Sequence, residues 1–137
     1  MARHLPAELS LSQTQAVRIA ATDRLYIPDL VVLPEAAMAD PGTEVAADEA
    51  LLVVEITSSR RNADTDRAFT RRGYAHGPVP LYLLVDRWAK PRASVTLFSE
   101  PRDGDYTRDV RVPFGEKITL PAPFGLDVDP AGFPPGQ

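Results

Sequence analysis

The sequence predicts an α/β protein: a mixed β-sheet with a helix packed on one of its faces. Residues 51–57 and 80–86 are apolar runs of strand length, and residues 62–76 between them suit a helix. Residues 93–100 and 105–114 alternate apolar and polar side chains around a short polar segment, which predicts a hairpin. Apolar strands on both sides of one helix indicate a sheet that is buried on at least one face.

The N-terminal third has weaker signals. Residues 9–23 fit a short helix or a strand, because the spacing of their apolar residues is ambiguous. Residues 24–33 are rich in β-forming side chains, and Pro28 among them indicates an edge position or a bulge. Residues 34–50 combine acidic residues with prolines, so we expect a loop there.

The predicted helix has recognisable ends. Asn62 or Asp64 can cap its N-terminus, because either side chain can accept hydrogen bonds from the first free backbone N–H groups. Gly77 and Pro78 end the helix after about His76.

A single domain over residues 1–137 is expected from the length, which is sufficient for a hydrophobic core. Near its end, residues 117–120 suit a short strand. Residues 121–137 form a proline-rich C-terminal tail, part of which we expect to dock in an extended conformation.

Composition excludes several kinds of chemistry. The chain contains no cysteine, which rules out disulfides, thiol nucleophiles and cysteine metal sites. The net charge of −4 argues against avid, non-specific DNA binding but leaves room for a local basic site. The N-terminus lacks the apolar segment of a signal peptide, and no apolar run approaches the roughly 20 residues of a membrane helix. We therefore expect a cytoplasmic protein that does not interact with membranes.

Two carboxylates stand inside apolar strands. Glu55 lies in the 51–57 run and Asp29 lies in the 24–33 run. The simpler interpretation of Glu55 is a carboxylate that has reached solvent at a strand end, or one paired with an arginine. If the two strands pair, however, the acids can converge into an oxygen site for Mg²⁺ or Mn²⁺. Such a cation activates water and stabilises the charge that develops on a phosphate.

The motifs "PDLVVL", "LLVVEITSS" and "DTDRAFTRRGYAHGPVPLYLLVD" resemble the Uma-type family of restriction endonucleases, within the PD-(D/E)XK nuclease superfamily. The resemblance runs from about Tyr26 to Asp86, and more loosely to about Asp129. It implies a restriction-endonuclease-like fold, DNA as the partner and Mg²⁺ or Mn²⁺ as the cofactor. It also implies that this chain is short at its N-terminus.

The resemblance also assigns roles to residues. Asp29 and Glu55 match the two acidic metal ligands, and the Ile56 carbonyl could complete the ligand set. Where the superfamily has a lysine two residues after the acid, this chain has Thr57. In the "D-R-x-x-K" pattern on the helix, which Asp66 and Arg67 match, the lysine position is occupied by Thr70.

The missing lysine weakens the expected catalysis. Thr70 supplies a hydroxyl without charge, so Arg71 or Arg67 is the candidate to reach the phosphate. Five arginines fall between residues 60 and 72, and they form either a phosphate-contacting cluster or simply a solvated helix face. We therefore expect metal binding with weak or absent turnover.

Three functions remain open at this point. The first is a Mg²⁺-dependent DNA endonuclease with Asp29, Glu55, Thr70 and Arg71 in its catalytic site. The second is a catalytically degenerate nuclease fold that acts as a binding or assembly module. An exposed sheet edge in that case would favour a homodimer. The third, a small β-rich structural module, leaves both strand-borne acids unexplained.

Overall fold

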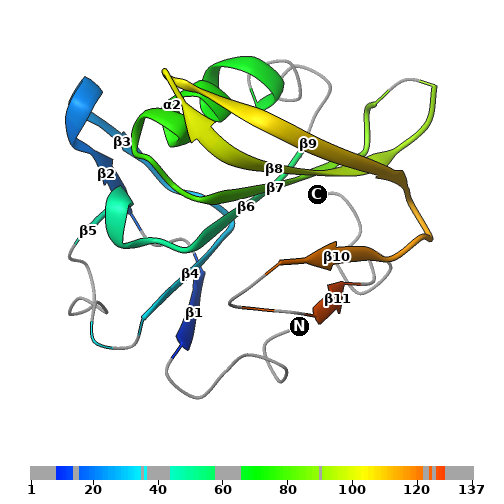
Figure 1. Cartoon of the computed structure of the whole chain (residues 1–137), viewed down its shortest axis with the longest axis horizontal. Coiled ribbons are helices and arrows are strands. Elements are labelled where there is room, and N and C mark those ends of the chain that lie inside the picture. The colour runs from blue at the N-terminus through cyan, green and yellow to red at the C-terminus, as the bar shows by residue number, and fades with distance from the viewer. Residues whose placement is uncertain are drawn as a thin grey trace.

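A six-stranded mixed sheet forms the centre of the molecule, with strand order β1-β4-β6-β7-β8-β9 (Figure 1). Its strands are β1 (Leu9–Gln13), β4 (Leu30–Pro34), β6 (Leu52–Ile56), β7 (Leu81–Asp86), β8 (Ser94–Arg102) and β9 (Asp105–Pro113). The computed structural model describes residues 9–13, 16–34, 36, 44–57, 66–89, 91–121, 124 and 126–128.

Strands β6 and β7 pair in parallel, whereas the other neighbours in this sheet pair antiparallel. A parallel pair needs a crossover connection, and here the crossover contains the π-helical turn η5 (Asp66–Thr70) followed by α2 (Arg71–His76). The predicted α/β class and its helix on a mixed sheet are thereby confirmed. The predicted caps Asn62 and Asp64 lie outside the described residues.

Smaller elements cover the helix-bearing face of the sheet. They are β2 (Val17–Ile19), the 3₁₀ turn η2 (Ala20–Thr22), β3 (Arg24–Tyr26), β5 (Val45–Ala46) and the 3₁₀ turn η4 (Ala47–Glu49). The three strands form their own sheet in the order β3-β2-β5, with β2 and β5 parallel. The prediction of a loop for residues 34–50 is therefore wrong for residues 45–49. A two-residue strand depends on its distant partner and leaves almost no local pattern.

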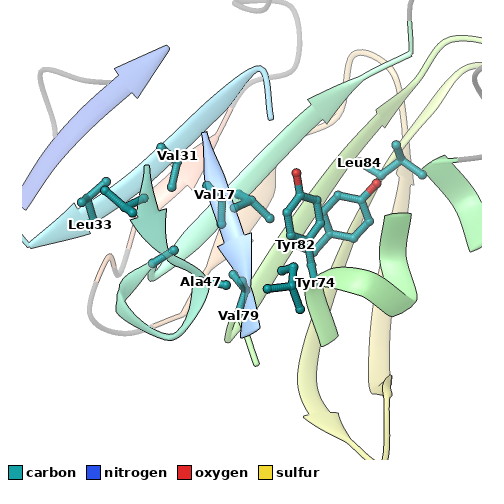
Figure 2. Packing of buried hydrophobic residues seen from close by; sticks show 12 residues of the cluster. Val17, Val31, Leu33, Ala47, Tyr74, Val79, Tyr82 and Leu84 are labelled. Carbon is teal, nitrogen blue, oxygen red and sulfur yellow. The ribbon is translucent and has the colours of Figure 1, made fainter. Parts of the chain in front are cut away.

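The helix-side core lies between this small sheet, α2 and the central sheet (Figure 2). Val31 of β4, Val53 of β6 and Leu84 of β7 contribute to it from the central sheet. Tyr74 of α2 and Tyr82 of β7 are both completely buried within it. Because every other residue of a strand points to this face, Glu55 belongs to the same face as Val53.

The opposite face is covered by a hairpin of β10 (Ile118–Leu120) and β11 (Leu126–Val128), which pair antiparallel. Ile118 and Leu120 pack with Leu83 and Leu97 in a second apolar cluster. All six residues of β7 are buried, since the strand is covered on both faces. The short strand predicted for residues 117–120 is present as β10. Most of the predicted tail, residues 121–137, lies outside the described residues, so its docking stays a prediction.

The break between β3 and β4 matters for the site. Residues 24–33 were expected as one β-rich segment, but they form two strands in two different sheets. Ile27, Pro28 and Asp29 connect them, and Pro28 is buried in the connection. Asp29 therefore stands immediately before β4. Among the described residues, no helix is long and apolar enough to cross a membrane.

Helix α2 approaches β3 so closely that only glycine fits at position 73. A methyl group at Gly73 would lie 2.7 Å from Cζ and 2.8 Å from Cε2 of Tyr26. The Tyr26 ring also packs against Tyr74, with 5.1 Å between ring centroids. The Tyr26 ring therefore lies against both the α2 backbone at Gly73 and the ring of Tyr74.

We expect Gly73→Ala to lower the free energy of unfolding by about 1 to 3 kcal/mol, because the added methyl group overpacks this contact. Urea denaturation measures the loss. In a Tyr26→Leu background the same substitution should cost much less, since the obstructing ring is gone. An equal cost in both backgrounds would contradict the steric explanation.

Candidate functional site

Asp29 and Glu55 lie at the same end of two paired strands. In the β4–β6 register Leu30 faces Val54, so continuing the antiparallel pairing by one residue places Asp29 opposite Glu55. The backbone N–H of Ile56 donates a hydrogen bond to Asp29 Oδ2 at 2.6 Å. This bond ties Asp29 to β6 at the residue that follows Glu55. The strand pairing on which the predicted site depends is therefore present.

Glu55 is half-buried and has a hydrogen-bond partner from the helix. The hydroxyl of Tyr74 donates to Glu55 Oε2 at 2.8 Å. The Tyr74 ring is completely buried, so its hydroxyl has a fixed position and holds the carboxylate at the end of β6. A glutamate is tolerated in this apolar strand because its charge is met by a hydrogen-bond donor rather than by hydrocarbon.

The donor set fits a hard divalent cation. Two carboxylates on adjacent strands offer oxygen ligands, and Mg²⁺ in proteins is commonly held by one or two carboxylates while it retains several waters. The described residues contain no group of three or more histidine, cysteine, aspartate and glutamate side chains that could hold a metal. The assignment of Asp29, Glu55 and the Ile56 carbonyl as ligands stays a prediction.

Thr57 occupies the place where the predicted superfamily pattern has a lysine. Its side chain is completely buried, and its Oγ1 accepts a hydrogen bond from the Arg87 N–H at 3.0 Å. The Thr57 N–H donates to the Val85 carbonyl at 3.0 Å. Thr57 therefore joins the end of β6 to the end of β7, and it brings no positive charge to the acids.

The two helix residues proposed for catalysis have different surroundings. Thr70 is buried at the junction of η5 and α2. Arg71 forms a two-pronged ion pair with Asp105 of β9, at 2.9 Å from Nε and 3.1 Å from the terminal nitrogen. Its guanidinium also lies 5.7 Å from the centre of the Phe98 ring. Arg71 is thus directed towards the sheet edge at β9.

The rest of the predicted arginine cluster is only partly described. Arg72 is exposed and lies 3.9 Å from Asp105. The side chains of Arg60, Arg61 and Arg67 lie outside the described residues. Whether this cluster contacts phosphate therefore stays a prediction.

The ion pair of Arg71 affects the acidity of its partner. Partial burial raises the pKa of Asp105, but hydrogen bonds from Arg71 and the Tyr106 N–H, with the charges of Arg71 and Arg72, outweigh it. The net result is a pKa below the ordinary value for aspartate. Such a group stabilises the fold only while it is ionised.

A row of aromatic rings links the helix to the sheet, and sequence analysis did not identify it as a unit. The ring centroids of neighbouring members of the row lie 5.1 to 6.4 Å apart, and the order along the row is not the order along the chain. The members are Phe69, Tyr26, Tyr74, Tyr82, Phe98 and Tyr106. These residues come from η5, β3, α2, β7, β8 and β9, so local sequence spacing carries no signal for the row.

A groove of about 760 Å³ lies on the opposite face of the sheet. Leu81, Leu97 and Ile118 contribute to its floor, and Arg108 and Lys117 are among its polar lining residues. Asp29 and Glu55 do not line this groove. The candidate site is thus an open strand end on the helix side and not this groove.

A mixed sheet with a crossover helix and acids at the ends of adjacent strands defines a protein of the restriction-endonuclease-like class. The chain matches the model of the Uma2 family, described as "Putative restriction endonuclease", over residues 2–131. It therefore belongs to this family, and the predicted resemblance is confirmed. A comparison with curated proteins found no match.

We expect Asp105→Asn to lower the free energy of unfolding by about 0.5 to 1 kcal/mol at neutral pH, because the pair with Arg71 is partly exposed. The difference should persist above the ordinary aspartate pKa of about 3.9 and vanish as the pH falls through the lower pKa of the folded protein. Urea denaturation at several pH values measures it. Asp109→Asn, on the same strand and exposed, is the control. If the loss of unfolding free energy in Asp105→Asn were the same at every pH, the ion pair with Arg71 would not be its cause.

Proposed function

We propose that this protein is a Mg²⁺-dependent endonuclease that hydrolyses phosphodiester bonds in DNA with low turnover. The supporting observation is the bond from the Ile56 N–H to Asp29, in a register that sets Asp29 opposite Glu55. Membership of a restriction-endonuclease family supports DNA as the substrate. Mn²⁺ would serve in place of Mg²⁺, since both prefer carboxylate and water ligands.

Asp29 and Glu55 can keep their present hydrogen bonds when a cation binds. Each carboxylate has two oxygens and about four lone-pair sites. Asp29 accepts a hydrogen bond from the Ile56 N–H at Oδ2, and Glu55 accepts one from the Tyr74 hydroxyl at Oε2. The two bonds orient the carboxylates, so less freedom remains to be lost on binding. The Ile56 carbonyl is the proposed third protein ligand.

Bound Mg²⁺ would lower the pKa of a coordinated water and stabilise negative charge on the phosphate. The chain's own part is to hold both acids at one strand end and to supply the hydroxyl of Tyr74 behind Glu55. Thr57 and Thr70 add no charge that could stabilise the transition state. Arg71 is paired with Asp105, and as an arginine it stays protonated, so it cannot take a proton from water. These features account for low turnover.

The same features favour a second candidate function. A family member in which Thr57 fastens two strands and Arg71 fastens the helix to β9 could keep the fold as a DNA-binding or assembly module without hydrolysis. This candidate differs from the first in one measurable property, which is cleavage by metal-loaded protein.

Wild-type protein should bind Mn²⁺ in calorimetry and slowly nick supercoiled plasmid with Mg²⁺ or Mn²⁺. Glu55→Gln and Asp29→Asn should each weaken Mn²⁺ binding at least about tenfold and abolish nicking, because each removes one anionic ligand. Glu49→Gln, an exposed acid on η4, serves as the control and should match wild type.

Three results decide between the candidates. Nicking that survives in Glu55→Gln would mean a contaminating nuclease or another site. Metal binding without nicking by any variant would favour the module. Absence of metal binding by the wild type would refute the metal site.

Tyr74→Phe should lower the Mn²⁺ affinity by about tenfold, because it removes the hydroxyl that orients Glu55 and leaves the ring in place. Tyr82→Phe, a buried tyrosine of the same core, is the matched control. Thermal denaturation without metal checks that both variants are folded. Equal Mn²⁺ affinities for the two variants would show that the Tyr74 hydroxyl has only a structural role.

A further inference from the structure

Phe69 is an apolar ring exposed beside the candidate site. The residue lies on η5, in the turn before α2, and is 48% exposed. Tyr26 meets it edge-on at 6.4 Å, and the Arg24 guanidinium lies 4.8 Å from its ring centre. Arg24 and Tyr26 are two residues apart on β3, so both side chains reach Phe69 from the same side of that strand.

This ring is connected to Glu55 through three successive contacts, the first of which is its contact with Tyr26. Tyr26 packs on Tyr74, and the Tyr74 hydroxyl donates to Glu55. Along the chain, Tyr26 is three residues before Asp29. The turn η5, which carries Phe69, is followed directly by α2, whose Tyr74 reaches Glu55.

The chemistry of the pair suits one type of ligand. An exposed aromatic face stacks on nucleobases of any sequence, and a guanidinium plane stacks on bases as well. Arg24 in addition stays positively charged and can meet the phosphate next to a stacked base. In an intact duplex the faces of the bases are covered by their neighbours, so a base would have to be extruded to reach Phe69.

We propose that Phe69 and Arg24 form a stacking platform for an unpaired nucleobase, and that the preferred DNA is single-stranded or contains unpaired bases. This inference rests on the proposed function for the nature of the ligand. The platform would hold one nucleotide by its base while an adjoining phosphodiester reaches the Asp29 and Glu55 end of the strands. Phe69 offers no hydrogen bond, so the platform selects unpaired bases without selecting a sequence.

The test is fluorescence anisotropy with a short labelled DNA strand of mixed sequence, alone and annealed to its complement, in EDTA so that no cleavage occurs. Wild type should bind the single strand at least about fivefold more tightly than the duplex. Phe69→Ala should weaken single-strand binding by about tenfold, which corresponds to about 1.4 kcal/mol, and leave duplex binding nearly unchanged.

Controls separate stacking from a general loss of structure. Phe114→Ala removes a ring of similar exposure, 40%, from the turn after β9 and should bind as wild type does. Phe69→Trp keeps an aromatic face and should retain the affinity for the single strand. This variant still tests the proposal if Phe69→Ala does not fold. Arg24→Gln should weaken single-strand binding. It should also reduce the slope of log affinity against log salt concentration by about one, the value for one lost phosphate contact.

Equal affinity for single strand and duplex, or equal losses in Phe69→Ala and Phe114→Ala, would overturn the platform. Loss of a dimer in Phe69→Ala, with DNA affinity unchanged, would also overturn it and identify the ring as a protein contact. Failure of the nuclease proposal has a different signature, because the EDTA assay needs no metal. If the protein prefers single strands in a Phe69-dependent way but nicks no DNA, the stacking platform is supported and the endonuclease proposal is refuted.

Discussion

The antiparallel register between β4 and β6 is the constraint on which the candidate site depends. It sets Asp29 opposite Glu55, and the Ile56 N–H fastens Asp29 to the neighbouring strand. A slip by one residue would move either acid to the opposite face, away from Tyr74. Such a slip would also exchange the apolar residues of β4 and β6 between the two cores, where they would meet side chains of the wrong size and shape. The close packing of both cores therefore helps to fix the position of the acids.

Tyr74 connects this register to the helix. Its ring fills the core beneath α2, and its hydroxyl reaches Glu55. Gly73 next to it lets the Tyr26 ring approach, and Tyr26 in turn supports the exposed Phe69. The packing of the helix and the orientation of the Glu55 carboxylate thus depend on the same few side chains. Stability and site geometry cannot be varied independently here.

Thr57, at the predicted superfamily position of a lysine, and Arg71, next to the predicted family position at Thr70, both have structural roles in this chain. Thr57 bonds to the end of β7, and Arg71 binds Asp105 on the edge strand. Each arrangement satisfies a buried or half-buried polar group, so each is favourable for the fold. The consequence is that Thr57 and Arg71 bring little free positive charge to the two acids.

The sequence by itself determined the fold class, the strands at β6 and β7, the hairpin of β8 and β9, and the two acids as candidate ligands. Those features follow from apolar runs, alternation and the local chemistry of a carboxylate in an apolar strand. Only the tertiary structure decided the division of residues 24–33 between two sheets, the strand at 45–46, and the partners of Glu55 and Arg71. These depend on contacts between residues 19 to 34 positions apart, or on pairing with a distant strand, and no local pattern records which partner lies across the fold.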